Sequence, residues 1–301
     1  MQEPEHSEWS GRTDGTPFMQ KALIVLFKVV PLEVIYGVMA LVAPFYMLFN
    51  HKGYLAIYHF FRHRMGKRPL SAFWHVYRNH YAFGQVVLDR FATYAGKRFK
   101  LTVDGNENYL RLNEGESGFM MLSSHVGNYE QAGYALTSDR KQFYALVYAG
   151  ESATVMNERG KQFVGSNIHM IPVQADMSHL FLINKALDDG DIVSMPSDRC
   201  FGSAKSVECQ FFGATARFPL GPFATAVQKE VPALAVTVMK TERRSYTAFV
   251  RPLDCDRTMP RRQQMAALAQ DFATTLEEIV RQYPHQWYNY YEFWEDDRTN
   301  V

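Results

Sequence analysis

A histidine and a glutamate follow a short apolar segment at a spacing that suits proton transfer. The apolar run Phe119–Leu122 has the length and composition of a buried strand, and His125 follows it after two serines. Glu130 falls in the first turn of a helix that we expect to begin at Asn128. Histidine exchanges a proton near neutral pH, and a carboxylate on its other ring nitrogen fixes the tautomer and stabilises the imidazolium. His125 and Glu130 therefore form a candidate general-base pair for a group-transfer enzyme.

The position of His125 favours chemistry over a purely structural role. A histidine beside Ser123 and Ser124 can also belong to a hydrogen-bonded loop with no catalytic task. In α/β folds, however, reactive groups gather at the carboxyl ends of strands, where His125 is expected to lie.

Composition limits the classes of protein to consider. The 301 residues are 47% hydrophobic and 14% aromatic, so a sizeable core can form. A formal net charge of +1 argues against a broad nucleic-acid surface. The three cysteines, Cys200, Cys209 and Cys255, show no Cys-x-x-Cys spacing, which predicts reduced thiols and no disulfide framework. Because the histidines are also dispersed, no metal site is expected.

The N-terminal part of the chain predicts a membrane anchor. Residues 1–17 form a polar, flexible lead-in, and residues 34–49 carry no charge. That run is somewhat short for a bilayer span of roughly 20 residues, so the segment either spans the membrane or lies in its surface. The alternative is a buried helix of a soluble core. Aromatic residues and the basic cluster Arg62–Arg68 follow, as expected at the headgroup level on the cytoplasmic side. We expect residues 18–68 to form the anchor and residues 69–301 the catalytic domain.

Strands and helices alternate along the rest of the chain. Strands are expected at residues 99–103, 119–122, 143–148, 167–173, 191–196, 207–212, 233–239 and 246–252. Helices are expected at residues 69–94, 106–113, from 128 onward, 151–166, 177–188, 218–229 and 259–283. This alternation predicts an α/β fold with a mostly parallel mixed sheet flanked by helices.

Several short segments, in order, resemble one enzyme family. They are the histidine followed after four residues by Glu130, the pair Asn157 and Arg159, the turn Pro196–Gly202, the segment Phe211–Pro222, and the Pro-x-Gln-Trp-Tyr run Pro284–Tyr288. Each is weak by itself, but the ordered set resembles the lysophospholipid acyltransferases of the bacterial lipid A late (lauroyl or myristoyl) acyltransferase type. The resemblance covers most of the chain and implies a glycerolipid acyltransferase-like fold behind a hydrophobic anchor.

The resemblance also implies a reaction and its partners. A fatty acyl group would move from an acyl thioester, on acyl carrier protein or CoA, to a hydroxyl of a membrane lipid, most naturally a lipid A precursor. His125 would be the base and Glu130 would orient it. Candidates for stabilising the transition state or holding the acceptor are backbone N–H groups after Gly127 and the side chains of Asn157, Arg159, Asp198, Arg199 and Arg217. No cofactor is implied, and the enzyme would work at the cytoplasmic face of a bacterial inner membrane.

Acyl carrier protein is acidic, so a basic patch should receive it. Arg243–Arg244 or Arg261–Arg262 would suit on charge alone.

Two departures from the family pattern leave the acceptor open. Arg199 and Cys200 follow Asp198 where the family usually has a second acidic residue, and the C-terminal tail lacks the basic ending common in lipid A enzymes. A lyso-phospholipid or an aminoacyl lipid is therefore an alternative acceptor. More remote alternatives are a hydrolase with Ser123 or Ser124 as nucleophile, although neither lies in Gly-x-Ser-x-Gly, and a non-catalytic lipid-binding protein.

Overall fold

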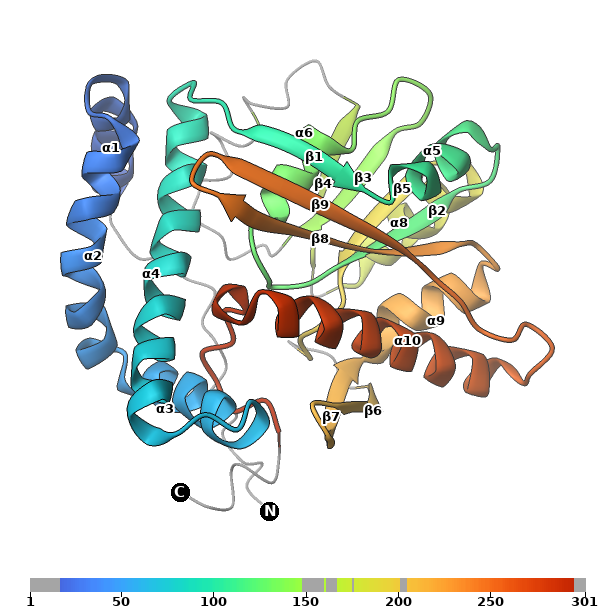
Figure 1. Cartoon of the computed structure of the whole chain (residues 1–301). Helices are drawn as coiled ribbons and strands as arrows, with labels where there is room; N and C mark the ends of the chain where they lie inside the picture. The colour runs from blue at the N-terminus through green and yellow to red at the C-terminus, as the bar shows by residue number, and fades with distance from the viewer. Residues whose placement is uncertain (1–16, 148–159, 161–166, 175, 201–204, 295–301) are drawn as a thin grey trace.

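A seven-stranded sheet forms the centre of the computed structural model, which describes residues 17–147, 160, 167–174, 176–200 and 205–294 (Figure 1). Its strand order is β1 (Lys100–Asp104), β9 (Ser245–Leu253), β8 (Ala233–Glu242), β2 (Phe119–Ser123), β5 (Ile192–Pro196), β3 (Phe143–Val147) and β4 (Ile168–Pro172). Neighbouring strands are parallel, except that β8 and β9 are antiparallel. The predicted α/β class with a mostly parallel mixed sheet is confirmed.

Helices cover both faces of the sheet, and strand β2 shows how the sequence divides between them. Met120 and Leu122 point into one core, whereas Phe119 and Met121 point into the other. The first core lies under α8 (Ser178–Asp188), α9 (Leu220–Gln228) and α10 (Arg261–Gln282), and the second lies under α5 (Asn106–Glu114) and the short α6 (Ala132–Ala135). Burial on both faces explains why β2 is continuously apolar.

A separate hairpin differs from the expected pattern. Strand β6 (Ser206–Phe211) pairs with β7 (Ala214–Pro219), a strand that the sequence reasoning did not predict. Phe212 and Gly213 connect them with φ of 52° and 74°, the left-handed pair that a two-residue type I′ turn requires. The helix expected from Phe218 consequently begins two residues later, at Leu220.

The N-terminal segments form a helical layer beside the sheet. Helices α1 (Pro17–Val29) and α2 (Leu32–Phe49) lie alongside α4 (Pro69–Tyr94), and α3 (His51–His59) with a π-helical turn (Phe60–Arg64) connects α2 to α4 (Figure 1). The buried residues of α2 are Leu32, Ile35, Tyr36, Ala43 and Met47. Its exposed large apolar residues are Val34, Val38, Leu41, Val42, Phe45, Leu48 and Phe49. The helix therefore packs one stripe against the protein and turns an apolar stripe outward.

Within the described ranges, α2 is the one helix long and apolar enough to cross a membrane. Its 18 residues have a mean hydropathy of 1.9, and 28% of them are buried. Exposed apolar residues on α1 (Phe18, Val29) and at the start of α4 (Leu70, Trp74) continue the same kind of surface. These features support association with a membrane, while the expected domain division at residues 68 and 69 stays a prediction.

Candidate active site

The carboxyl ends of two neighbouring parallel strands bring His125 and Asp198 together. Strand β2 pairs in register with β5, so Ser123 lies opposite Pro196, and the Ser197 N–H donates to the Ser123 carbonyl over 2.8 Å. His125 Nδ1 lies 2.8 Å from Asp198 Oδ1, and the His125 backbone N–H donates to Oδ2 over 2.8 Å. One carboxylate thus holds both the ring and the backbone of the histidine.

The surroundings of His125 and Asp198 suit a histidine base whose ring is oriented by an ionised carboxylate. Asp198 has 1% of its side chain exposed, whereas His125 has 26% exposed. Burial alone would raise the pKa of Asp198, but the charge of His125, its hydrogen bonds and the nearby Arg199 outweigh burial and lower that pKa below the ordinary value. The ionised carboxylate accepts the Nδ1 proton, which leaves Nε2 as the ring nitrogen that can take a proton from a substrate.

Glu130 has different partners from those that the sequence predicted. Its carboxylate lies 3.0 Å from Arg90 Nε and accepts a hydrogen bond of 2.7 Å from the Tyr94 hydroxyl, both on α4. The chain after Gly127 enters a short 3-10 turn (Tyr129–Gln131) in place of a full helix, and this turn directs the buried Glu130 side chain toward α4. The carboxylate on His125 Nδ1 is therefore that of Asp198, and Glu130 fixes the loop to α4.

The first backbone N–H group after Gly127, that of Asn128, was expected to be available for an oxyanion but has a partner within the protein, as has the Gly127 N–H. The Gly127 N–H donates to the Gln286 carbonyl over 2.8 Å, and the Asn128 N–H donates to the Val238 carbonyl over 2.7 Å. Gly127 has a φ of 56°, and a Cβ at this position would lie 2.0 Å from the Val238 carbonyl oxygen. Only glycine fits this close approach, so Gly127 shapes the loop that carries His125.

The other predicted site residues do not all meet His125. Asn157 and Arg159 lie outside the described residues. Arg199 directs Nη2 to the Tyr288 carbonyl at 2.7 Å, and its guanidinium lies 5.7 Å from the Tyr291 ring centroid, so it contacts the C-terminal tail. Arg217 is exposed on β7, with Nε 3.9 Å from Glu208 Oε1.

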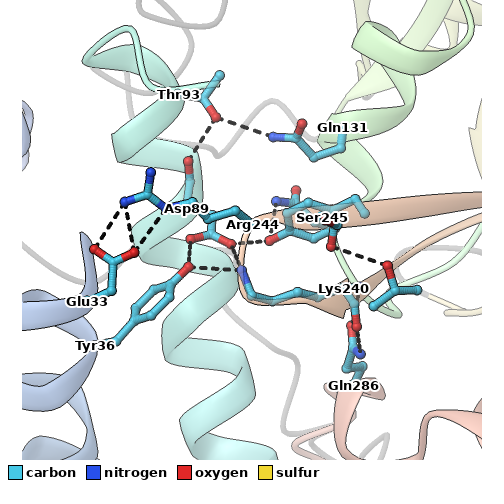
Figure 2. Close-up of polar contacts among 12 residues, drawn as sticks. Glu33, Tyr36, Asp89, Thr93, Gln131, Lys240, Arg244, Ser245 and Gln286 are labelled. Carbon is cyan, nitrogen blue, oxygen red and sulfur yellow. Dashed lines mark hydrogen bonds and ion pairs between the residues drawn. The ribbon is translucent and has the colours of Figure 1, made fainter. Parts of the chain in front are cut away.

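A buried polar cluster joins the N-terminal helices to the sheet close to the His125 loop. The fully buried Asp89 of α4 accepts hydrogen bonds from Tyr36 of α2, Lys240 of β8 and Tyr246 of β9 (Figure 2). Burial raises the pKa of Asp89 and lowers that of Lys240. The Asn128 amide lies 3.4 Å from the Tyr246 hydroxyl, which connects the cluster to the loop. Sequence reasoning missed these residues, because no local pattern relates positions on four separate elements.

Comparison with known proteins places the chain in a family. A family model described as "Bacterial lipid A biosynthesis acyltransferase" matches residues 89–294, a range that includes His125, Asp198 and the C-terminal tail. The chain belongs to this family. The crystal structure of the 1-acyl-sn-glycerophosphate (LPA) acyltransferase PlsC from Thermotoga maritima is similar at 13% sequence identity and a TM-score of 0.34, covering 85% of this chain and 99% of that one. A search of curated proteins found no match.

The family membership makes the protein an acyltransferase that acts on a lipid. Among the described residues, no group of three or more His, Cys, Asp or Glu side chains is arranged to hold a metal ion. Cys200, Cys209 and Cys255 are free thiols.

Proposed function

We propose that the protein transfers a fatty acyl group from an acyl thioester to a hydroxyl of a lipid, with His125 as general base and Asp198 as its orienting carboxylate. The observation that carries the proposal is the contact between these residues at the carboxyl edge of the sheet, inside the segment that matches the family. Glu130 supports the same loop from α4 through Arg90 and Tyr94.

The proposed step needs one base and no protein nucleophile. His125 Nε2 takes the proton of the acceptor hydroxyl while that oxygen attacks the thioester carbonyl carbon. The tetrahedral intermediate then loses the thiolate, and the imidazolium returns the proton to the sulfur, so an ester and a thiol are formed. Asp198 stabilises the imidazolium between these transfers. General-base catalysis of this kind accelerates a reaction by about 10²–10⁴.

Charge on the thioester oxygen and on the acceptor headgroup requires further donors. Since the Gly127 and Asn128 N–H groups bond within the protein, Arg159 and Asn157 stay the proposed donors to the oxyanion or to an acceptor phosphate. Arg217, exposed on β7, is the proposed contact for an anionic headgroup, whereas the role of Arg199 is assigned to holding the tail.

The proposed donor is acyl carrier protein or CoA as a co-substrate, with no bound cofactor. Of the arginine pairs considered for an acidic carrier, Arg244 forms a two-point ion pair with Glu33 of α2 (Figure 2). Arg261 Nη2 lies 3.2 Å from Glu230 Oε1. Arg243 and Arg262 are exposed beside them and suit contact with the carrier.

The membrane is the proposed working surface, at the cytoplasmic face of a bacterial inner membrane. The exposed apolar stripes of α1, α2 and the start of α4 would enter the lipid interface, as amphipathic surface helices do. The basic segment contributes less than its sequence indicates: Arg62 donates to the Lys67 carbonyl, and the Arg64 guanidinium lies 4.6 Å from the Trp294 ring centroid.

A transfer assay tests the proposal. Purified protein in detergent receives labelled acyl–acyl carrier protein or acyl-CoA and a panel of acceptors, which contains a lipid A precursor, a lyso-phospholipid and an aminoacyl lipid. We expect transfer to the lipid A precursor, and loss of that transfer in His125→Ala. Transfer to another acceptor alone would keep the mechanism and change the substrate, and unaltered transfer in His125→Ala would overturn the catalytic assignment. Thioester hydrolysis through a covalent acyl-serine would point to the hydrolase instead.

A further inference from the structure

Three different segments in succession form hydrogen bonds with the edge of strand β8 that faces away from β9. Strand β2 pairs with it at Ala233–Ala235, and the loop after His125 takes over at Val238 through the Asn128 N–H. At Lys240 the carboxamide of Gln286 takes the same role. Its Oε1 accepts from the Lys240 N–H over 2.8 Å, and its Nε2 donates to the Lys240 carbonyl over 2.8 Å (Figure 2). A side-chain amide thus occupies the place of a strand's peptide group.

The backbone on either side of this carboxamide holds the loop that carries His125. The Gln286 carbonyl accepts from the Gly127 N–H over 2.8 Å, Val126 and Trp287 form an antiparallel bridge, and the Tyr288 N–H donates to the His125 carbonyl over 3.3 Å. Residues 286–288 therefore lie along residues 125–127 like an added strand.

Helix α4 fastens the same tail segment from its other side. The amide of the fully buried Asn79 donates to the Trp287 carbonyl over 2.8 Å and to the His285 carbonyl over 3.2 Å. Residues 285–287 are consequently held by α4 and β8. Because the same tail pairs with residues 125–127, the positions of α4 and β8 determine where the His125 loop lies.

We propose that Gln286 is a positioning residue for His125: its carboxamide sets the register of the tail on β8, and the tail in turn sets the direction of the imidazole. This inference rests on the proposed function of His125 and extends it to the C-terminal tail. Asp198 fixes the rotation and tautomer of the ring and binds the His125 N–H, whereas Gln286, through the tail, fixes the backbone from the His125 carbonyl to Gly127. A misplacement of about 1 Å in a reacting group lowers a rate by up to about 10².

A direct contact between Gln286 and substrate is the competing explanation. Gln286 lines a cavity of about 470 Å³ together with Tyr36 of α2, Tyr81 of α4 and Lys240 of β8. The two explanations differ in kinetics, because the loss of a positioning residue lowers kcat, whereas the loss of a binding contact raises KM.

The experiment compares Gln286→Ala and Gln286→Glu with wild type, and uses Gln282→Ala as the matched control. Gln282 is exposed at the end of α10, where its amide lies 3.4 Å from the Tyr283 hydroxyl. In the transfer assay we expect Gln286→Ala to lower kcat by about 10- to 100-fold with KM changed less than twofold, and Gln282→Ala to match wild type.

Gln286→Glu adds a signature that general destabilisation would not produce. The glutamate keeps the acceptor for the Lys240 N–H but donates to the Lys240 carbonyl only when protonated. Its activity relative to wild type should therefore rise as pH falls, while the relative activity of Gln286→Ala stays constant.

Hydrogen exchange gives a second readout that does not need activity. We expect the amides of residues 125–128 to exchange at least tenfold faster in Gln286→Ala, with residues 119–123 of β2 unaltered. Unchanged kcat with unchanged exchange, or a raised KM with unchanged kcat, would overturn the inference. Absence of transfer in wild type would defeat the proposed function, and the exchange measurement would still decide the positioning role.

Discussion

Replacing Asp198 with asparagine removes the charge beside His125 and keeps the shape of the side chain. Both Asp198 oxygens are in use, one at 2.8 Å from His125 Nδ1 and one at 2.8 Å from the His125 backbone nitrogen. An asparagine offers one acceptor and one donor group. If the asparagine oxygen accepts from the ring, its NH₂ group faces the His125 backbone N–H, and two donors then oppose each other. If its NH₂ faces the ring, Nδ1 must accept, and the proton moves to Nε2, where it blocks the base.

The expected loss in rate is large because neither orientation of the asparagine amide accepts hydrogen bonds from both the His125 ring and the His125 backbone N–H. The corresponding exchange in a serine protease triad lowers kcat by about 10⁴, and general-base catalysis as a whole contributes about 10²–10⁴. We expect Asp198→Asn to lower kcat by about 10²–10⁴ with little change in KM. The unfolding free energy should fall by about 1.5–3 kcal/mol, since hydrogen bonds to a charged group are lost.

Steady-state transfer kinetics and chemical denaturation of the same preparations measure both quantities. Glu130→Gln is the matched control, because it also neutralises a buried carboxylate near the loop. A kcat for Asp198→Asn within threefold of wild type, in a folded protein, would refute the orienting role. A much larger kcat loss in Glu130→Gln than in Asp198→Asn would return that role to Glu130.

The structure supports further predictions. Glu130→Gln should lower the unfolding free energy by about 1.5–3 kcal/mol, measured by urea denaturation, because the contacts of Glu130 with Arg90 and Tyr94 lose the carboxylate charge. Gly127→Ala should abolish transfer and lower the melting temperature, since a left-handed residue other than glycine costs about 1–3 kcal/mol and its Cβ would meet the Val238 carbonyl oxygen. Burial and the charges of Arg78, His75 and Lys67 lower the pKa of His285 to about 4. Between pH 4 and the ordinary histidine pKa of about 6.5, the unfolded chain therefore binds more protons at His285 than the folded protein does. The unfolding free energy should fall by about 1–2 kcal/mol as the pH drops through this window, allowing for solvent screening. His285→Gln should reduce this pH dependence, measured by denaturation at several pH values. Leu41→Glu with Phe45→Glu should weaken the affinity for anionic vesicles, measured by sedimentation, by about 10²–10⁴, because each exposed apolar side chain that enters the lipid contributes about 1.5–3 kcal/mol.

Local patterns predicted the elements of the fold and the position of His125. Each expected strand within the described residues forms within one residue of its predicted bounds, except that β8 continues three residues past Met239 to Glu242. The agreement arises because strand length, apolar content and turn residues are local signals. Strand β7 was missed because Gly213 was interpreted as the end of a strand. The alternating buried residues Ala216 and Phe218 after a Phe-Gly turn were the signal that could have identified it.

The partner of His125 depended on long-range arrangement. Asp198 lies 73 positions away and meets the histidine because β5 is the neighbour of β2, a strand order that no single segment encodes. Glu130 was near in sequence, but Arg90 and Tyr94 attract it to α4. The outward stripe of α2 could not be predicted either, since residues 34–49 carry no charge on any side of the helix and packing against α4 decides which stripe is buried.

The most direct test of the account is a single-turnover measurement of acyl transfer from a labelled acyl thioester to a lipid acceptor, with wild type beside His125→Ala and equal binding of donor confirmed for both. The account predicts formation of the acyl ester in wild type and a rate at least 10² lower in His125→Ala, with the fold intact. Ester formation at the wild-type rate in His125→Ala would contradict the central claim that His125 is the base of the reaction.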